Sequence, residues 1–261
     1  MIIFKITDGL GNQLFQWAYG YSLARKFNTK VYYDISHYHS EQFLNTQSAN
    51  RNFSLPNLIN ENIPLLTQEA LNEFQSKPQY IIQDNFNFNH FDYSDNYSYY
   101  FSGYWQSENY FKDYRDDILS LIDFNIVTPD NFDKSTSIHI RRGDYLQQQE
   151  IHPVCSIDYY KKAINFLGKE GVFNVFSDDI EWCKDNLLFE NLNFIDGNSD
   201  IYDLKLMSLS SNNIIANSTF SWWSAWLNQN KDKKIVAPEN WFGFSVNHPI
   251  DDLVPKSWIL F

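Results

Sequence analysis

The second half of the chain alternates short apolar runs with longer stretches of helical periodicity. The apolar runs are bounded by turn residues and predict strands at residues 137–140, 172–176, 192–195, 213–216 and 234–237. The stretches between them predict helices at residues 156–167, 179–188, 203–209 and 220–229. Because parallel strands are joined by right-handed crossovers through helices, this order predicts a parallel sheet covered on both faces, typical of a nucleotide-binding lobe.

The first half opens with the same order and then becomes rich in loops. Its pattern predicts a strand at residues 2–6, a glycine loop at 8–12, a helix at 13–27 and a second strand at 30–33. Asn, Gln and Tyr dominate residues 37–100, and a later unit reads as a strand at 98–103 and a helix at 107–122. The fold class expected is α/β, with two Rossmann-like lobes and a cleft between them. Residues 125–134 would join an N-terminal lobe (1–130) to a C-terminal lobe (131–261).

Composition and charge exclude some classes of partner. The chain has 261 residues, of which 43% are hydrophobic and 20% are charged, and its net charge is −12. This negative charge argues against nucleic acid, or a broad anionic membrane surface, as the main partner. An anionic ligand would need a local cationic pocket, which makes a pair of adjacent arginines the feature to look for.

The sequence carries no targeting or membrane-spanning signal. Its first six residues are too few for the apolar core of a signal peptide. No apolar run approaches the roughly 18 residues that a transmembrane helix needs. The two cysteines, Cys155 and Cys183, are too few for a disulfide framework and are expected to be buried thiols. We therefore expect a cytoplasmic protein.

Polar clusters follow three of the predicted strands, at the edge where parallel sheets bind ligands. These clusters are Arg141-Arg142-Gly143-Asp144, Ser177-Asp178-Asp179 and Asn217-Ser218-Thr219. Adjacent arginines in extended chain point in opposite directions, so one guanidinium can bind phosphate oxygens while the other pairs with a carboxylate such as Asp144. The structural alternative is an Arg–Asp pair at the end of a strand.

Two of the clusters also have a simple capping interpretation. A helix N-terminus after residues 217–219 would bind an anion through its free N–H groups and its dipole, but the same residue types cap helices without any ligand. Asp179 is expected to cap the next helix, whereas Asp178 and Asp203 stay open between capping and binding a hydroxyl group. The tryptophans of residues 220–229 follow helical spacing and are expected to lie in the core.

The glycine loop near the N-terminus is a weaker signal. Gly9 and Gly11 fail the dinucleotide pattern, because Leu14 stands where the third glycine would be. The loop better suits close backbone approach and amide contacts of Asn12 and Gln13 with a sugar. Further along the chain, Trp105 and its neighbours in residues 103–109 are candidates for the wall of an acceptor site, with core packing as the alternative.

A metal site is not predicted. The chain has no Asp-x-Asp pair, and its six histidines lack the spacing of zinc ligands. An enzyme that releases a diphosphate without a metal must neutralise the developing charge with arginine and helix dipoles. The adjacent arginines meet that requirement.

Taken in order, these motifs resemble the bacterial α-1,2-fucosyltransferases of glycosyltransferase family 11. The segments that carry the resemblance are Asp8-Gly9-Leu10-Gly11-Asn12-Gln13, His139-x-Arg141-Arg142-Gly143-Asp144-Tyr145, Phe176-Ser177-Asp178-Asp179 and Asn217-Ser218-Thr219-Phe220-Ser221-Trp222-Trp223. The match runs from residue 2 to about residue 242. Each motif is modestly specific, whereas the ordered set is highly specific. Asp8 departs from the pattern, because many members carry a second glycine there.

The resemblance implies a GT-B type fold, GDP-fucose as the donor substrate, and a terminal galactose as the acceptor. It also implies inversion at the anomeric carbon without a metal or other cofactor. In this family pattern Arg141 stabilises the leaving diphosphate, and Arg142 and Asp144 support it. The residues carried over as donor-binding are Gly11, Asn12, His139, Asp178, Asp203, Asn217, Ser218, Thr219 and Phe220, and the acceptor-side candidates are Asp8, Trp105 and Glu108.

The reaction expected is a single displacement in which a galactose 2-hydroxyl attacks the anomeric carbon of fucose. The sequence does not choose a general base among Asp8, Glu108, Asp144 and Asp178. The expected acceptor is a bacterial surface glycan, assembled on a lipid carrier, which would bring the enzyme transiently to the inner membrane. The alternatives are a fucosyltransferase of different linkage and a non-catalytic carbohydrate-binding protein on a transferase fold.

Overall fold

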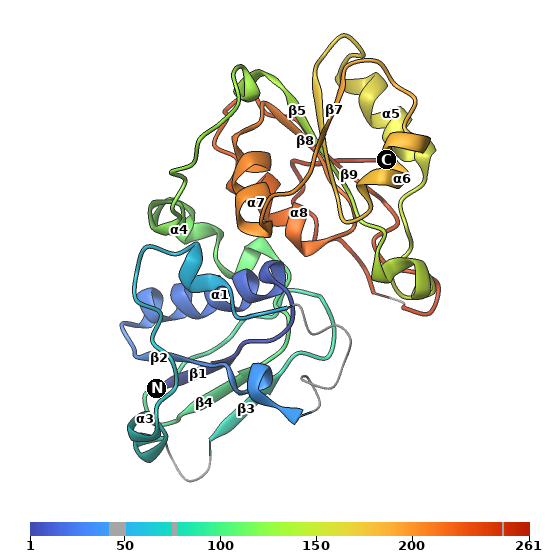
Figure 1. Ribbon diagram of the computed structural model, residues 1–261. Helices are drawn as coiled ribbons and strands as arrows, with labels where there is room; N and C mark the ends of the chain where they lie inside the picture. Colours follow the sequence, from blue (N-terminus) through green and yellow to red (C-terminus); the bar gives the residue numbers. More distant parts are fainter. Residues whose placement is uncertain (42–50, 75–77, 247) are drawn as a thin grey trace. The chain divides into compact units, whose positions relative to one another are not determined.

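The structure, a computed structural model, describes residues 1–41, 51–74, 78–246 and 248–261, and the chain folds into two compact units (Figure 1). Unit 1 contains Met1–Asp123 and Pro249–Pro255, and unit 2 contains Phe124–His248 and Lys256–Phe261. The chain therefore first leaves unit 1 after Asp123, whereas the sequence pattern predicted this boundary after residue 130. Residues after Asp123 belong to unit 2 because Ile126 packs against its core and the Val127 carbonyl accepts a hydrogen bond from Tyr202.

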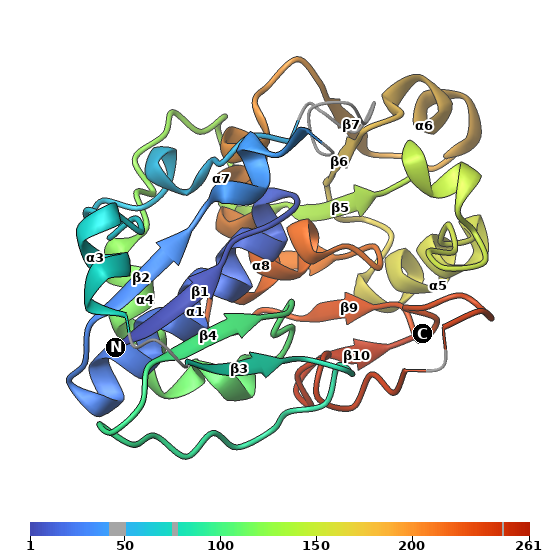
Figure 2. The same ribbon diagram turned by 90° about the horizontal axis from the view of Figure 1, so that it is seen from below.

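Unit 1 is built on a parallel four-stranded sheet with the order β2-β1-β4-β3 (Figure 2). The strands are β1 (Ile2–Lys5), β2 (Val31–Asp34), β3 (Gln79–Ile82) and β4 (Tyr99–Ser102). Helix α1 (Leu10–Phe27) packs closely on one face. A Cβ at Gly20 would lie 2.8 Å from the Tyr33 hydroxyl, so only glycine allows this approach.

Helix α1 begins earlier than its sequence pattern predicts. The amides of Asn12 and Gln13 both donate to the Gly9 carbonyl, at 2.9 and 3.1 Å, so Gly11 and Asn12 belong to the first helical turn rather than to a loop. The helix ends where predicted, because Asn28 adopts the left-handed conformation that commonly terminates helices.

The predicted helix at residues 107–122 is only partly correct. The structure has two 3₁₀ turns, η3 (Glu108–Tyr110) and η4 (Lys112–Tyr114), followed by α4 (Arg115–Leu121). Phe111, between the two turns, has φ −147° and ψ −2°, which interrupts helical hydrogen bonding. The Ser107 side chain accepts from the Asn109 amide and so favours the first tight turn over a regular helix.

The loop-rich interval of unit 1 contains short elements that the pattern did not predict. They are η1 (Ser36–His39), η2 (Leu55–Asn57), α3 (Gln68–Glu73) and the edge strand β3. Each spans six residues or fewer, which is too short to show a clear hydrophobic period. The strand β3 exists because it pairs with β4, with Gln79 opposite Tyr99.

Unit 2 is built on a parallel six-stranded sheet with the order β10-β9-β8-β5-β6-β7. Its strands are β5 (Thr136–Ile140), β6 (Phe173–Ser177), β7 (Leu192–Ile195), β8 (Asn212–Ile214), β9 (Ile235–Ala237) and β10 (Ile259–Leu260). Strand β10 was not predicted. It pairs with β9 after the chain has passed through Pro249–Pro255 of unit 1.

Helices cover both faces of this sheet, as the alternating pattern predicts. Helices α5 (Ile157–Leu167) and α6 (Ile180–Asn186) pack on one face around Ile138, Val175 and Ile214. On the other face, α7 (Asp200–Leu209) packs against Phe176 of the sheet and α8 (Thr219–Leu227) packs against α7. Figure 1 shows these two pairs of helices on opposite sides of β5 to β9.

Candidate functional site

The three polar clusters of the second half lie at one edge of the unit 2 sheet. Strand β5 is hydrogen-bonded to β6 on one side and to β8 on the other, with Ile140 opposite Ser177 and Ile138 opposite Ile214. All three strands are parallel, so the segments that follow their carboxyl ends are neighbours. The sequence pattern predicted this juxtaposition correctly.

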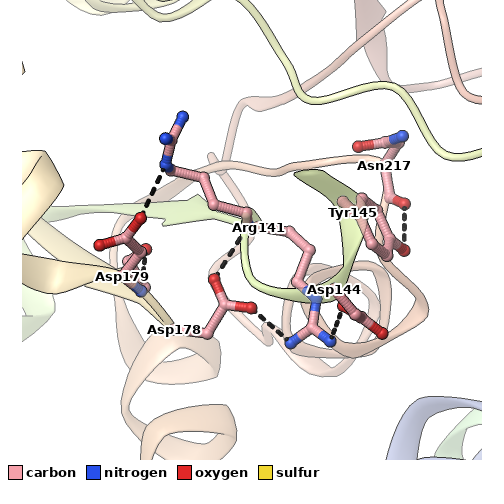
Figure 3. A network of polar contacts seen from close by, with 8 residues as sticks. Arg141, Asp144, Tyr145, Asp178, Asp179 and Asn217 are labelled. Carbon is pink, nitrogen blue, oxygen red and sulfur yellow. Dashed lines mark hydrogen bonds and ion pairs between the residues drawn. The ribbon is translucent and has the colours of Figure 1, made fainter. Parts of the chain in front are cut away.

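Arg141 is held by two carboxylates. Its Nη2 lies 2.6 Å from Asp144 Oδ1 and its Nη1 lies 2.8 Å from Asp178 Oδ2 (Figure 3). The guanidinium carbon lies 5.3 Å from the centre of the Tyr145 ring. The two ion pairs fix the orientation of the guanidinium group, and the side chain is 26% exposed, so a ligand in solvent can still reach it. Fixed, partly desolvated guanidinium groups are well suited to binding phosphate oxygens.

Arg142 points elsewhere and has a structural role. Its Nε lies 3.0 Å from Asp179 Oδ2, and its guanidinium carbon lies 3.5 Å from the centre of the Trp182 ring. Alternation along extended chain predicted the opposite directions of the two arginines. The expected pairing of one with phosphate and the other with Asp144 needs correction, because Asp144 contacts Arg141 and Asp179 contacts Arg142.

Asp178 organises the arginine loop. Its Oδ1 accepts from the Arg142 amide at 2.9 Å, while its Oδ2 pairs with Arg141. A Cβ at Gly143 would lie 2.5 Å from this carboxylate, which explains the glycine by close approach. Both carboxylate oxygens are engaged by the arginine loop, so Asp178 supports Arg141 and Arg142, and direct contact with the donor stays a prediction. Asp179 caps α6 as predicted, accepting from the Trp182 amide.

His139 is buried beside the arginines. Its ring centre lies 5.5 Å from that of Phe220, at the start of α8. Burial, and then the charge of Arg141, lower the pKa of His139 to about 3, so the imidazole is neutral. Within the described part of the chain, its Nδ1 atom is buried and has no hydrogen-bond partner. A buried ring nitrogen in this state is suited to hydrogen bonding with a neutral ligand group.

Asn217 does not match its predicted role. Its Nδ2 donates to the carbonyls of Pro153 (2.9 Å) and Trp241 (3.0 Å), and its Oδ1 lies 3.5 Å from Cys155 Sγ. The Tyr145 hydroxyl donates to the Asn217 carbonyl at 3.2 Å (Figure 3). The side chain is 2% exposed. Asn217 therefore holds three segments together. Both hydrogens of its side-chain amide are used within the protein, so none remains to bind the donor substrate.

The N-terminus of α8 presents backbone groups rather than capping side chains. Ser218 is the residue before the helix, and its side chain makes no capping hydrogen bond. Thr219 and Phe220 are the first helical residues and are half-buried. Free N–H groups at this position are suited to an anion. Trp222 and Trp223 are fully buried, so the core interpretation of the tryptophans is confirmed.

Asp203 lies in the first turns of α7 and is held by Asn198, whose Nδ2 donates to Oδ1 at 2.9 Å. Burial raises the pKa of Asp203 from 3.8 to about 6, an effect that the Asn198 hydrogen bond opposes. A carboxyl group whose pKa is raised by burial is often functional. Asp203 remains a candidate donor-binding residue.

The predicted residues of unit 1 divide into buried and accessible groups. Asn12 is half-buried, and its Oδ1 accepts from Gln106 Nε2 at 2.9 Å, so it stays a predicted donor-binding residue, whereas Gln13 is fully buried and serves the fold. Glu108 begins the turn η3 and is half-buried. Asp8 is half-buried and directly follows the loop residue Thr7 after β1.

Trp105 is not an acceptor wall. Its side chain is 3% exposed and packs edge-on against Phe4, Phe101 and Tyr110. The core alternative is therefore the correct one. The exposed aromatic of this segment is its neighbour Tyr104, whereas Tyr145 and Trp182 were not predicted as site residues. Tyr145 was signalled by its place directly after the arginine motif, whereas Trp182 carried no signal.

Among the described residues, no group of histidine, cysteine and acidic side chains is arranged to hold a metal ion. The described helices also include none that is long and apolar enough to cross a membrane.

The sequence matches the family model of glycosyl transferase family 11 over residues 8–260. The chain belongs to glycosyltransferase family 11. An Escherichia coli protein named α-1,2-colitosyltransferase is 33% identical, over 99% of this chain and 98% of its own length. The Escherichia coli O-antigen biosynthesis glycosyltransferase WbnK is 31% identical, over 97% of this chain and 98% of its own length.

Solved structures show a similar fold. The crystal structure of the α-1,6-fucosyltransferase NodZ soaked with GDP-fucose gives a TM-score of 0.50 at 12% identity, covering 87% of this chain and 92% of that one. At this identity the similarity concerns the fold alone. The GT-B type α/β fold that the motifs implied is confirmed, and the protein is a fucosyltransferase-like glycosyltransferase.

Proposed function

We propose that the protein transfers L-fucose from GDP-fucose to the 2-hydroxyl of a terminal galactose, with inversion and without a metal. The observation that carries this proposal is the fixed guanidinium of Arg141, at the carboxyl edge of the unit 2 sheet and beside the N-terminus of α8. The family supplies the reaction class, and NodZ, whose crystals were soaked with GDP-fucose, shares the fold.

Arg141 supplies the electrostatic part of catalysis in this proposal. A guanidinium has five N–H donors, and the ion pairs with Asp144 and Asp178 leave several for phosphate oxygens. Negative charge grows on the departing diphosphate in the transition state. A cation already fixed in place stabilises that charge without reorganising, and this favours the transition state over the bound substrate.

The remaining unit 2 residues position the donor. The neutral His139 and the carboxyl group of Asp203 are suited to the hydrogen-bonding groups of guanine. The N–H groups at the start of α8, around Ser218 and Thr219, are suited to the diphosphate. Arg142, Asp144 and Asp178 keep Arg141 and its loop in place.

GDP-colitose is a second candidate donor. The relative that is 33% identical over nearly the whole chain is named a colitosyltransferase. Colitose is the 3-deoxy form of L-fucose, so the two donors differ by one hydroxyl group. The acceptor we propose is a galactose-terminated surface glycan on a lipid carrier, reached by a cytoplasmic enzyme that associates transiently with the inner membrane.

The test is turnover of each donor with lactose and methyl β-galactoside as acceptors. We expect Arg141→Ala to reduce kcat by about 10²-fold or more, because it removes a transition-state contact to charge. Arg25→Ala is the matched control, since Arg25 forms an exposed pair with Asp117 far from the arginine loop in sequence. Product linkage is read by NMR, and the assay is repeated with EDTA.

The outcomes separate the candidates. Near wild-type turnover by Arg141→Ala would remove the assigned role of Arg141. Faster transfer from GDP-colitose than from GDP-fucose would identify the second donor. Loss of activity in EDTA, restored by a divalent cation, would contradict metal independence. Donor and galactoside binding with no product would indicate the carbohydrate-binding alternative.

A further inference from the structure

The carboxyl edge of the unit 1 sheet carries its own cluster of polar and aromatic side chains. Asp8 follows β1, Tyr38 lies in η1 after β2, and Tyr104 follows β4. Arg51 approaches the same loop, with its Cδ 3.8 Å from the position of a Cβ on Gly9. Parallel sheets bind ligands at this edge, and the donor-binding residues of unit 2 do not account for these groups.

Asp8 is held in an unusual backbone conformation. Its φ is +64°, in the left-handed region that favours glycine. Its carbonyl accepts two hydrogen bonds, from the Tyr38 hydroxyl at 2.8 Å and from Gln13 Nε2 at 2.9 Å. Buried side chains therefore impose the conformation through the backbone, and the carboxylate is not needed for it. Glycine would adopt this conformation without strain, so an aspartate at this position indicates a functional role for its side chain.

The Asp8 carboxylate interacts with Tyr104 as well as with Tyr38. The Tyr104 hydroxyl is hydrogen-bonded to it, and burial together with this carboxylate raises the pKa of Tyr104 to about 12. Arg51 acts on Tyr38 and Tyr104 in the opposite direction. The phenol thus remains a hydrogen-bond donor at neutral pH and orients the carboxylate.

Tyr104 also provides an accessible apolar face. Its ring is parallel to that of Phe86, with an interplanar angle of 5° and centres 6.2 Å apart. Gln83 Oε1 accepts from the amides of Tyr104 (2.9 Å) and Trp105 (2.8 Å), which fixes a tight turn. This turn directs Trp105 into the core and leaves Tyr104 38% exposed. A rigid aromatic face beside a carboxylate combines the two features that a sugar ring requires of a binding site.

We propose that this edge of unit 1 is the acceptor subsite, in which Tyr104 and Phe86 contact the galactose ring and Asp8 removes the proton of the attacking hydroxyl. The inference rests on the proposed function and deepens it. The hydroxyl oxygen forms the bond to the anomeric carbon of the donor sugar. The bond from that carbon to the phosphate oxygen breaks and its electron pair leaves with GDP. The hydroxyl proton passes to the Asp8 carboxylate.

Asp8→Asn and Tyr104→Phe test the two roles. Asp8→Asn keeps the size of the side chain and suits the left-handed backbone, but it cannot accept the proton. We expect kcat to fall by about 10²-fold or more. Tyr104→Phe keeps the aromatic face and removes the hydroxyl. We expect its kcat to fall while the KM for methyl β-galactoside stays near that of the wild type, because the hydroxyl orients the carboxylate whereas the ring contacts the sugar.

Tyr104→Ala tests the aromatic face, and we expect the KM for methyl β-galactoside to rise about tenfold, an effect of the size that loss of a good apolar contact produces. Binding of GDP, measured by calorimetry, is expected to be unchanged in all three variants. Tyr80→Phe is the matched control, because Tyr80 lies in the edge strand β3 and is 64% exposed. Thermal melting verifies that each variant is folded.

The outcomes keep this inference separate from the proposed function. If the wild-type protein transfers no sugar to a galactoside, both proposals fail. If the wild type is active and folded Asp8→Asn and Tyr104→Ala match it, the acceptor subsite is wrong while the transferase function stands. Weakened GDP binding with an unchanged galactoside KM would also overturn the subsite, and would assign the cluster to the donor.

Discussion

The loops that follow β1 in unit 1 and β5 in unit 2 both begin at the carboxyl end of a strand flanked on both sides, but the first carries a carboxylate and the second carries two arginines. After β5, two arginines are surrounded by Asp144, Asp178 and Asp179. After β1, a single carboxylate, Asp8, interacts with the phenols of Tyr38 and Tyr104. In both loops, groups from neighbouring elements fix the charge before any ligand binds. This difference supports our proposals that the unit 2 edge binds the diphosphate and that the unit 1 edge binds the acceptor hydroxyl.

The two loops also hold their charged side chains in different ways. In unit 2, ion pairs and the packing of Arg142 on Trp182 hold the arginines. In unit 1, Asp8 is held in an unfavourable backbone conformation with a positive φ. Substitutions that remove a charged side chain should therefore affect the stability of the two loops by different amounts.

The largest effect on stability is expected for Arg142→Ala. The change removes the partner of Asp179 and the cation over Trp182, and the arginine is only 13% exposed. We expect the free energy of unfolding to decrease by about 1–3 kcal/mol, as for loss of a hydrogen bond to a charged group. Urea denaturation measures it. Arg25→Ala, which breaks an exposed pair, should change it by less than about 1 kcal/mol. Equal losses in the two variants would mean that Arg142 is not a structural anchor.

A smaller effect, with a distinct pH dependence, is expected for Asp203→Asn. The pKa of Asp203 is raised in the folded protein from 3.8 to about 6, so the folded state binds more protons than the unfolded state between these values. The free energy of unfolding of the wild type therefore falls as pH rises through this window. Asn cannot ionise, so the variant should be more stable at pH 7 by about 1 kcal/mol after allowance for solvent screening.

Denaturation at pH 4 and pH 7 measures this difference between Asp203→Asn and the wild type. It should vanish near the ordinary pKa of 3.8. GDP affinity is expected to decrease in the same variant if Asp203 contacts the donor. A stability difference that does not depend on pH would contradict the buried carboxyl group.

The smallest effect on stability is expected for Asp8→Gly. Glycine adopts the left-handed conformation without a steric cost, which offsets the lost hydrogen bond to Tyr104. The free energy of unfolding should stay within about 1 kcal/mol of the wild type. Asn28→Gly is a matched control, because Asn28 also has a positive φ, at the end of α1. Both variants should melt alike, and only Asp8→Gly should lose transfer activity.

Much of unit 2 followed from its sequence pattern. The apolar runs and helical stretches are long enough to show their periods, and each central strand leads directly into a polar cluster. The arginine loop, the buried tryptophans and the Asp179 cap were predicted for this reason. In unit 1 the described elements β3 and α3 span four and six residues, too short to show a period, so they were not predicted.

Local periodicity and an ordered set of motifs were enough to establish the parallel α/β class, the family and the position of the arginine loop. Which side chains pair became visible only in the folded chain. Asp178, 36 residues from the Arg142 amide that it accepts from, meets the arginines because β5 and β6 are in register. The pairing of β3 with β4 likewise brings Gln83 to the amides of Tyr104 and Trp105. The resulting turn directs Trp105 into the core and Tyr104 towards solvent. Such contacts depend on strand register and on the packing of distant segments, which no local pattern specifies.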